Sequence, residues 1–135
     1  MVMADIDDFK RINDTCGHKV GDTVLVKIAE AFINRLRKND FVARYGGEEF
    51  AFIFPETDIE NACKISEIIN RLVKDLDTSV FFGDKDISLT ISCGVSTAYP
   101  AQEGDSIDGL MKRADDALYD AKKSGKNRVM IRKSN

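Results

Sequence analysis

The sequence lacks the features that mark several specialised classes of protein. No apolar stretch approaches the roughly 20 residues that span a bilayer, and the start has neither the basic region nor the long apolar core of a signal peptide. Positive charge is not in excess, because the formal net charge is -3 at pH 7, which argues against a nucleic-acid-binding surface. We therefore expect no nucleic-acid partner and no membrane contact by this domain.

Cysteine is also scarce. Cys16, Cys63 and Cys93 are odd in number, lie far apart and form no Cys-x-x-Cys pair. This spacing indicates neither a zinc site nor a disulfide framework. A reducing, cytoplasmic location is the simplest interpretation, and it is compatible with a parent protein that is anchored in a membrane.

What is present is typical of one globular domain. The 135 residues suffice for a core, and 43% of them are hydrophobic while 32% are charged. Repeats, low-complexity segments and internal linkers are missing, so residues 1–135 are expected to form a single domain. The chain starts abruptly with the apolar residues of a strand, which suggests a piece of a longer protein.

Apolar periodicity predicts where the helices lie. Apolar residues repeat at three- and four-residue spacing after Asp22, after Asp58 and after Ser106. Asp58 and Ser106 are suitable N-caps for their helices. Polar loops are expected over residues 13–21 and 100–105.

Apolar runs and alternation predict the strands, which are expected at residues 1–4, 41–43, 50–54, 80–82, 87–95 and 128–131. Two pairs of these strands are expected to form hairpins. The clean alternation over residues 87–95 predicts a strand with one buried face. The resulting order, β-α-β-β-α-β-β-α-β, favours an α+β sandwich in which helices pack on a mainly antiparallel sheet.

The pentapeptide Gly46–Phe50 carries the strongest chemical signal. Glycine permits a turn with positive φ and lets a ligand approach the backbone closely. The paired carboxylates of Glu48 and Glu49 suit a hard divalent cation. If the strands are neighbours, Asp5 joins them at one sheet edge, where like charges raise one another's pKa and a cation relieves the repulsion. The alternative is a solvated acidic turn.

Taken together, the motifs resemble the GGDEF domain, the catalytic domain of diguanylate cyclases. The matching segments follow the family order across essentially the whole chain: Asp5–Lys10, Asn13–His18, Gly21–Asp22, Arg44–Phe50 and Ala117–Lys122. The resemblance implies a palm-like, ferredoxin-like sandwich related to class III nucleotide cyclases. It also implies that two GTP condense into cyclic di-GMP with release of pyrophosphate. The family normally has a further helix before the first strand and an upstream sensory module, which residues 1–135 lack.

The resemblance assigns the metal and catalytic roles. Asp5, Glu48 and the backbone carbonyl of Ile6 match the family's metal ligands, and oxygen ligands suit Mg²⁺ or Mn²⁺. Two ions per active site are expected. Glu49 matches the acid that helps to activate the ribose 3′-hydroxyl, and Glu48 and Lys10 are further catalytic candidates. Which glutamate is the base stays open.

The resemblance also implies the contacts with substrate. Asn13 and Asp22 match the guanine-binding pair, since a carboxylate accepts hydrogen bonds from the N1–H and amino group of guanine, which adenine does not offer. Asp22 is alternatively a helix N-cap, and His18 is alternatively a residue that fixes its loop. The remaining candidates for the base pocket and the phosphates are His18, Leu25, Asp8, Phe9, Lys10, Lys122 and Lys126. The lysines alternatively complement a helix dipole.

A second ligand site is implied beside the hairpin. Arg37 and Asp40 form an Arg-x-x-Asp motif at the spacing of the family's inhibitory site, where cyclic di-GMP docks. Arginine binds phosphate bidentately and stacks on guanine. Arg71 is a candidate secondary contact there. On its own, an Arg-x-x-Asp motif would indicate only a helix end.

The implied reaction requires two copies of the domain. Each 3′-oxygen attacks the α-phosphate held by the opposing domain, so a two-fold homodimer is expected to be the active species. The isolated chain is expected to dimerise poorly. The main alternative is a catalytically weak or silent receptor for cyclic di-GMP or GTP. Two others are a related cyclase with a different product and a structural interaction domain.

Overall fold

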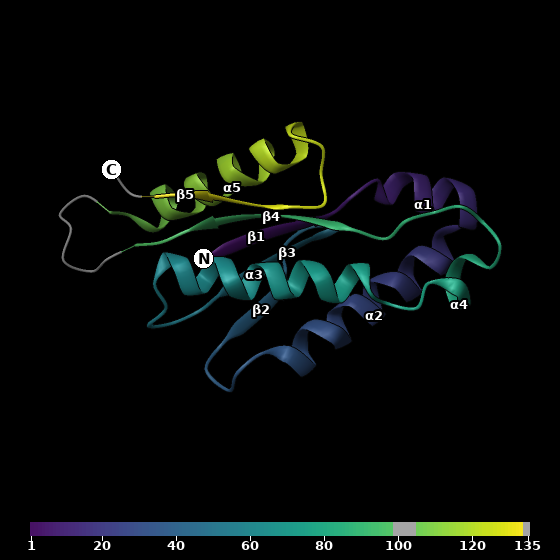
Figure 1. Cartoon of the computed structure of the whole chain (residues 1–135), viewed down its shortest axis with the longest axis horizontal. Coiled ribbons are helices and arrows are strands. Elements are labelled where there is room, and N and C mark those ends of the chain that lie inside the picture. The colour runs from purple at the N-terminus through teal and green to yellow at the C-terminus, as the bar shows by residue number, and fades with distance from the viewer. Residues whose placement is uncertain (99–104, 134–135) are drawn as a thin grey trace.

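The computed structural model describes residues 1–98 and 105–133, which form one five-stranded sheet in the order β2-β3-β1-β4-β5. The strands are β1 (Val2–Ile6), β2 (Phe41–Arg44), β3 (Glu49–Ile53), β4 (Ile91–Ser96) and β5 (Val129–Arg132). All neighbours pair antiparallel except β4 and β5, which are parallel. The expected α+β fold with a mainly antiparallel sheet is confirmed (Figure 1).

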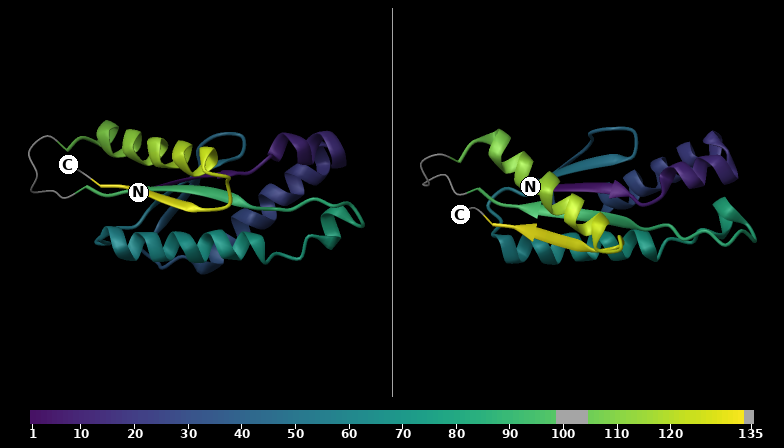
Figure 2. Two further views of the ribbon diagram at one scale, coloured as in Figure 1. Left: turned by 45° about the horizontal axis from the view of Figure 1, so that its top comes forward. Right: turned by 90° about the horizontal axis from the view of Figure 1, so that it is seen from above.

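Helices cover both faces of this sheet. They are α1 (Phe9–Cys16), α2 (His18–Arg35), α3 (Ile59–Lys74), α4 (Ser79–Phe82) and α5 (Ile107–Lys123). α5 lies on one face against β4 and β1, while α2 and α3 lie on the other (Figure 2). The expected N-caps are confirmed, since Asp58 accepts from Asn61 N at 2.8 Å and Ser106 from Gly109 N at 3.0 Å. Among the described residues, none of these helices combines the length and apolarity needed to cross a membrane.

The main core lies between the sheet and the helices α2 and α3. Phe32 of α2 is fully buried and meets the rings of Phe50 and Phe52 edge-on, with centroids 5.2 and 5.0 Å apart. Edge-to-face contact is a favourable geometry for aromatic rings. This cluster fixes β3, the strand that follows the Gly-Gly turn, against α2.

On the opposite face, α5 sits unusually close to β4. A Cβ on Gly94 would lie 2.1 Å from the carbonyl oxygen of Ala114 and 2.2 Å from the backbone nitrogen of Leu118. Backbone atoms cannot rotate away, so only glycine allows this approach. Gly94 therefore sets the distance of α5, and with it the place of the lysines at its C-terminal end.

The prediction of a polar loop over residues 13–21 is wrong, because most of this segment is helical. α1 runs to Cys16 and α2 begins at His18, with Gly17 at φ 90° between them. Phe9 and Ile12 are buried and pack α1 against its neighbour. The apolar face of such a short helix is easily hidden among polar residues.

The expected hairpin over residues 80–95 is also wrong. Residues 79–82 form α4, and β4 begins only at Ile91. Its burial is two-sided rather than one-sided, because α3 and α5 cover both faces. The observed order is therefore β-α-α-β-β-α-α-β-α-β. Most of the loop expected at residues 100–105 lies outside the described residues.

Candidate active site

The carboxyl end of β1 and the start of β3 place the acids together. Asp5 is the register partner of Glu49, and Ile6 N donates to the carbonyl oxygen of Glu48 at 3.1 Å. The prediction that these strands are neighbours is confirmed. Asp5 is only 5% exposed, although it is ionisable. A buried carboxyl group beside two glutamates is an electrostatic burden that needs a positive partner.

The pKa shifts at this edge follow from burial and crowding. Burial raises the pKa of Asp5, and Lys122, whose Nζ lies 2.8 Å away, acts against that rise. Burial also raises the pKa of Glu48, with the charges of Asp5 and Glu49 adding to the rise. The expected mutual repulsion of the acids is therefore present. Lys122, at the end of α5, relieves it in part.

The turn between β2 and β3 is held by its own backbone and by one arginine. Tyr45 N donates to the carbonyl oxygen of Glu49 at 2.8 Å. Arg44 donates through Nη2 to the carbonyl oxygen of Gly47 at 2.8 Å and through Nε to that of Gly46 at 3.2 Å. Arg44 is not among the residues predicted for the site, although an arginine two residues before a Gly-Gly pair is a usable signal.

Glu49 rests directly on the first glycine of the turn. A Cβ on Gly46 would lie 2.4 Å from Oε2 of Glu49, whereas a Cβ on Gly47 would meet nothing within 4 Å. The two glycines therefore differ in role. Gly46 makes room for the carboxylate of Glu49, and Gly47 keeps the backbone bare at the tip.

The donor set fits a hard cation. Among residues 1–98 and 105–133, His, Cys, Asp and Glu side chains form no group of three or more that would hold a metal ion. Asp5 and Glu48 contribute two carboxylates, and the carbonyl of Ile6 is a third oxygen candidate. Mg²⁺ is usually bound by one or two carboxylates together with the phosphates of a substrate. The chemistry of these donors therefore suits Mg²⁺ or Mn²⁺ better than a softer metal.

The candidate base-binding residues lie on α1 and on the first turns of α2. The side chain of Asn13 lies against Gly21, because a Cβ there would fall 1.9 Å from Asn13 Oδ1. Asp22 and His18 are exposed, while Leu25 is buried. Because α2 begins at His18, Asp22 lies inside the helix, and the alternative that it is the N-cap is wrong.

The candidate phosphate-binding residues converge on the start of α1. Asp8 precedes α1 in a left-handed conformation, at φ 53°, and its Oδ1 lies 2.6 Å from Nζ of Lys126. The hydrogen bond and charge of Asp8 raise the pKa of Lys126. Phe9 is buried, whereas Lys10 is exposed and lies 3.9 Å from Asp14. Lys122 and Lys126 thus approach the acidic edge from the C-terminal end of α5.

The Arg-x-x-Asp motif is a closed pair at the exit of α2. Asp40 accepts from Arg37 N at 2.9 Å, from its Nε at 3.1 Å and from its Nη2 at 3.0 Å. Burial alone would raise the pKa of Asp40, but the hydrogen bonds and charge of Arg37 outweigh it and lower the pKa. The Nη2 atom also donates to Thr57 at 3.1 Å. The guanidinium is therefore held in one orientation while remaining exposed.

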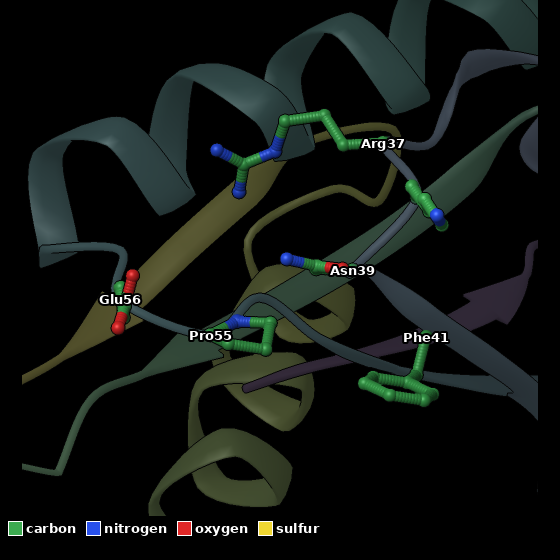
Figure 3. Close-up of a pocket in the computed structure, with 6 residues that line it drawn as sticks. Arg37, Asn39, Phe41, Pro55 and Glu56 are labelled. Atoms are coloured by element: carbon green, nitrogen blue, oxygen red, sulfur yellow. The ribbon is translucent and has the colours of Figure 1, made fainter.

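This arginine lines a hollow of about 560 Å³ between the α2–β2 connection and the end of β3 (Figure 3). The lining residues are Arg37, Lys38, Asn39, Phe41, Pro55 and Glu56. Arg71 lines a different hollow, together with Asn127 and Arg128. The two hollows share no lining residue, so the described structure does not bring Arg71 into the Arg37 hollow.

The fold and this edge define a class of protein: an α+β domain whose sheet presents acids and a glycine turn to the basic end of a helix. Comparison with known proteins specifies the class further. The family model "Diguanylate cyclase, GGDEF domain" matches residues 1–128, so the chain belongs to the GGDEF domain family. Membership implies use of a divalent metal, in agreement with the oxygen donors above.

Similar proteins are found among curated sequences. The response regulator PleD of Caulobacter vibrioides is 44% identical over 129 residues, which cover 96% of this chain and 28% of PleD. Diguanylate cyclase A of Treponema denticola is 42% identical over 135 residues, covering 100% of this chain and 35% of that protein. The chain thus spans about a third or less of these relatives.

Solved structures share the fold. The active GGEEF domain of a diguanylate cyclase from Vibrio cholerae has a TM-score of 0.87 at 34% identity, covering 99% of this chain and 82% of that one. The GGDEF domain of DgcB from Caulobacter crescentus, in complex with c-di-GMP, has a TM-score of 0.85 at 37% identity, covering 96% and 75%.

Proposed function

We propose that this domain condenses two GTP into cyclic di-GMP and releases two pyrophosphates. The observation that carries the proposal is the meeting of Asp5, Glu48 and Glu49 with Lys122 and Lys126 at one sheet edge. Negative groups there suit a metal, and positive groups beside them suit phosphates. Family membership and relatives named diguanylate cyclase support the same reaction.

Two divalent ions per active site, Mg²⁺ or Mn²⁺, belong to this proposal. Asp5, Glu48 and the carbonyl of Ile6 would hold them, with substrate phosphates completing the coordination. When bound, such an ion neutralises the acids and stabilises negative charge on the phosphates. The raised pKa values of Asp5 and Glu48 indicate carboxyl groups that benefit from a cation.

The side chains divide the remaining work. Glu49 accepts the proton of the ribose 3′-hydroxyl, whose oxygen then bonds to the α-phosphorus of the second GTP as the bond to pyrophosphate breaks. Lys10, Lys122 and Lys126 hold the phosphates and offset the charge that builds on the leaving group. The contact of Glu49 with Gly46 supports its role, because it keeps the carboxylate in one place.

Guanine selection is proposed for the junction of α1 and α2. Asn13 and Asp22 offer hydrogen bonds to the guanine edge, and Leu25 offers an apolar wall. His18 and the amides near Asp8 and Phe9 are the further substrate contacts. An adenine base would offer the carboxylate of Asp22 no such pair of donors.

The active species is proposed to be a homodimer with two-fold symmetry. Each domain supplies one GTP, and the two 3′-oxygens attack across the interface. Within residues 1–98 and 105–133, a single domain presents one such edge, where β1 ends and β3 begins. This requirement makes turnover depend on protein concentration or on a fused dimerising segment.

Product inhibition through Arg37 and Asp40 is the finer part of the proposal. Asp40 orients the guanidinium, which remains exposed beside the hollow of about 560 Å³. A phosphate of cyclic di-GMP and a stacked guanine suit such a group. A second candidate function follows from this same site: a catalytically weak receptor that binds cyclic di-GMP.

One experiment separates the two functions. The chain, fused to a coiled-coil dimerisation segment, is incubated with GTP and Mg²⁺, and the products are identified by mass spectrometry. Cyclic di-GMP and pyrophosphate are expected, and the Glu49→Gln variant should bind GTP without turnover. Tight binding of cyclic di-GMP with no product formed would favour the receptor, and turnover by the variant would remove Glu49 as the base.

A further inference from the structure

Asp7 is a buried carboxylate that the reaction described above does not use. It follows β1, is 5% exposed and has protein donors on both oxygens. Oδ1 accepts from Ser92 Oγ at 2.7 Å, and Oδ2 accepts from Thr90 Oγ1 at 2.7 Å and from Asn127 N at 3.0 Å. Its own N–H donates to the Thr90 carbonyl oxygen at 2.9 Å. Since a carboxylate has about four acceptor positions, most of this one's capacity is taken.

The third donor belongs to an unusual turn. Lys126 and Asn127 are consecutive non-glycine residues with positive φ, at 63° and 45°. Such a conformation persists only where surrounding contacts hold it. Asn127 is held on both sides: its N–H by Asp7, and its side-chain oxygen by Nδ2 of Asn70 at 3.3 Å. Asn70 in turn also donates to the Ile91 carbonyl oxygen at 2.7 Å.

The turn carries the lysine that faces the start of α1. Lys126 N donates to the Ala121 carbonyl oxygen at 3.0 Å, which ties the turn to α5, and Lys126 Nζ lies 2.6 Å from Asp8 Oδ1. Lysine has a flexible stem and a point charge, so its aim depends on where its backbone is fixed. Asp7, one residue before Asp8, fixes that backbone from the opposite end of the chain.

We propose that Asp7 is a positioning residue that holds the Lys126–Asn127 turn so that Lys126 meets the terminal phosphates of GTP. This inference rests on the proposed function, because it needs GTP at the acidic edge. It assigns to the second acid of Asp5-Ile6-Asp7 a role distinct from metal binding. The action is through hydrogen bonds, and it does not require a negative charge at position 7.

That distinction makes the substitution Asp7→Asn informative. An amide oxygen in the place of Oδ2 still accepts from Thr90 and Asn127, and an amide nitrogen in the place of Oδ1 donates to Ser92 Oγ, whose hydroxyl rotates to accept. The Asp7→Ala substitution removes every one of these contacts. A positioning role therefore predicts that Asn rescues what Ala loses, whereas a metal-binding role predicts that both substitutions fail.

The test measures binding of GTP and of GMP, with Mg²⁺, by calorimetry on the 135-residue chain. Lys126→Ala should weaken the binding of GTP roughly tenfold, the loss expected for one charged hydrogen bond. It should leave the affinity for GMP unchanged. Asp7→Ala should show the same pattern, and Asp7→Asn should stay near the wild type. In the Lys126→Ala background, Asp7→Ala should cost nothing more for GTP, because its effect passes through the lysine.

Several outcomes would overturn the proposal. The first is normal GTP affinity in Asp7→Ala, and the second is an equal loss of GTP and GMP affinity in that variant. The third is a double variant of Asp7→Ala and Lys126→Ala in which the two losses of GTP affinity add. If Asp7→Ala does not fold, Asp7→Ser keeps a polar group in the buried site, but its hydroxyl is too short to replace the contact of Oδ2 with Asn127 N. This variant should weaken GTP binding a few-fold and leave GMP binding unchanged, and unchanged GTP affinity would count against the proposal.

Different results would overturn the proposed function and the role of Asp7. A wild type that binds no GTP would overturn both the cyclase assignment and the role of Asp7. Normal GTP binding by the wild type and by Asp7→Ala would overturn only the latter. Hydrogen exchange at the Asn127 amide adds a structural readout. It should be faster in Asp7→Ala and unchanged in Asp7→Asn.

Discussion

Replacing Gly46 by Ala should disable catalysis without unfolding the domain. The new Cβ would lie 2.4 Å from Glu49 Oε2, whereas ordinary contact begins near 3.4 Å. The carboxylate must therefore move by about 1 Å, and a displacement of that size costs on the order of 100-fold in rate. The obstacle is the far end of a side chain, so the backbone has no reason to shift.

The measurement is pyrophosphate release by the dimerised protein, together with its Tm. Gly47→Ala is the matched control, since its Cβ would meet no protein atom within 4 Å. We expect the Gly46→Ala variant to lose about 100-fold in kcat with an unchanged Tm, and the control to lose much less. Full activity of Gly46→Ala would refute the reasoning. Equal losses in both variants would show that the bare turn matters rather than the position of Glu49.

Three other perturbations have clear directions. Arg37→Ala should relieve inhibition by cyclic di-GMP while leaving the initial rate of the dimerised protein intact, and inhibition curves that superimpose on the wild type would remove the regulatory role. Gly94→Ala should lower the free energy of unfolding by about 3 kcal/mol or more, at the upper end of overpacking costs, because the new Cβ meets backbone atoms 2.1 and 2.2 Å away; a Tm within a degree of the wild type would contradict this. Glu48→Gln should stabilise the metal-free chain at pH 7. Burial and neighbouring acids raise the pKa of Glu48 above 4.5, so its charged form costs stability once the pH exceeds that raised pKa, and the gain should vanish as the pH falls below 4.5. Urea unfolding at pH 7 and below pH 4.5 measures the free energy of unfolding of both proteins. A stabilisation by Glu48→Gln that grows at low pH would contradict the reasoning.

Local patterns were sufficient for the acidic edge. The apolar runs on either side of Gly46 and Gly47 predict the β2–β3 hairpin, and the acids that end β1 predict Asp5 at the same edge. Both depend on contacts within a few residues or on one antiparallel pairing. The register of Asp5 with Glu49 is the only long-range step. Sequence patterns predict a site correctly where each strand or turn carries its own local signal.

The errors have a physical pattern as well. Residues 80–82 have high strand propensity, yet Asp77 accepts from Ser79 N at 3.0 Å and from its hydroxyl at 2.6 Å, where α4 begins. β4 alternates polar and apolar residues, yet Ser92 and Ser96 are buried and hydrogen-bonded by distant partners. A local contact at the start of α4 overrode strand propensity in the first place, and tertiary contacts overrode the alternating pattern in the second.

The network around Asp7 was beyond sequence reasoning for a different reason. Asp7 and Asn127 are 120 residues apart, and Asn70 reaches the same turn across 57 residues. Nothing in a lone Asp or Asn indicates such partners. The same holds for Arg71, whose neighbours are set by how α3 lies against β5.

The central place of β1 has a consequence for synthesis on the ribosome. This fully buried strand is made before both of its partners, since β3 ends at Ile53 and β4 ends at Ser96. At roughly 5–20 residues per second, β1 remains for several seconds without β4, its second partner strand. The backbone nitrogen of Met1 then donates to the Ser96 carbonyl oxygen at 2.8 Å. The nascent domain is therefore most exposed to aggregation, and most in need of a chaperone, before β4 emerges.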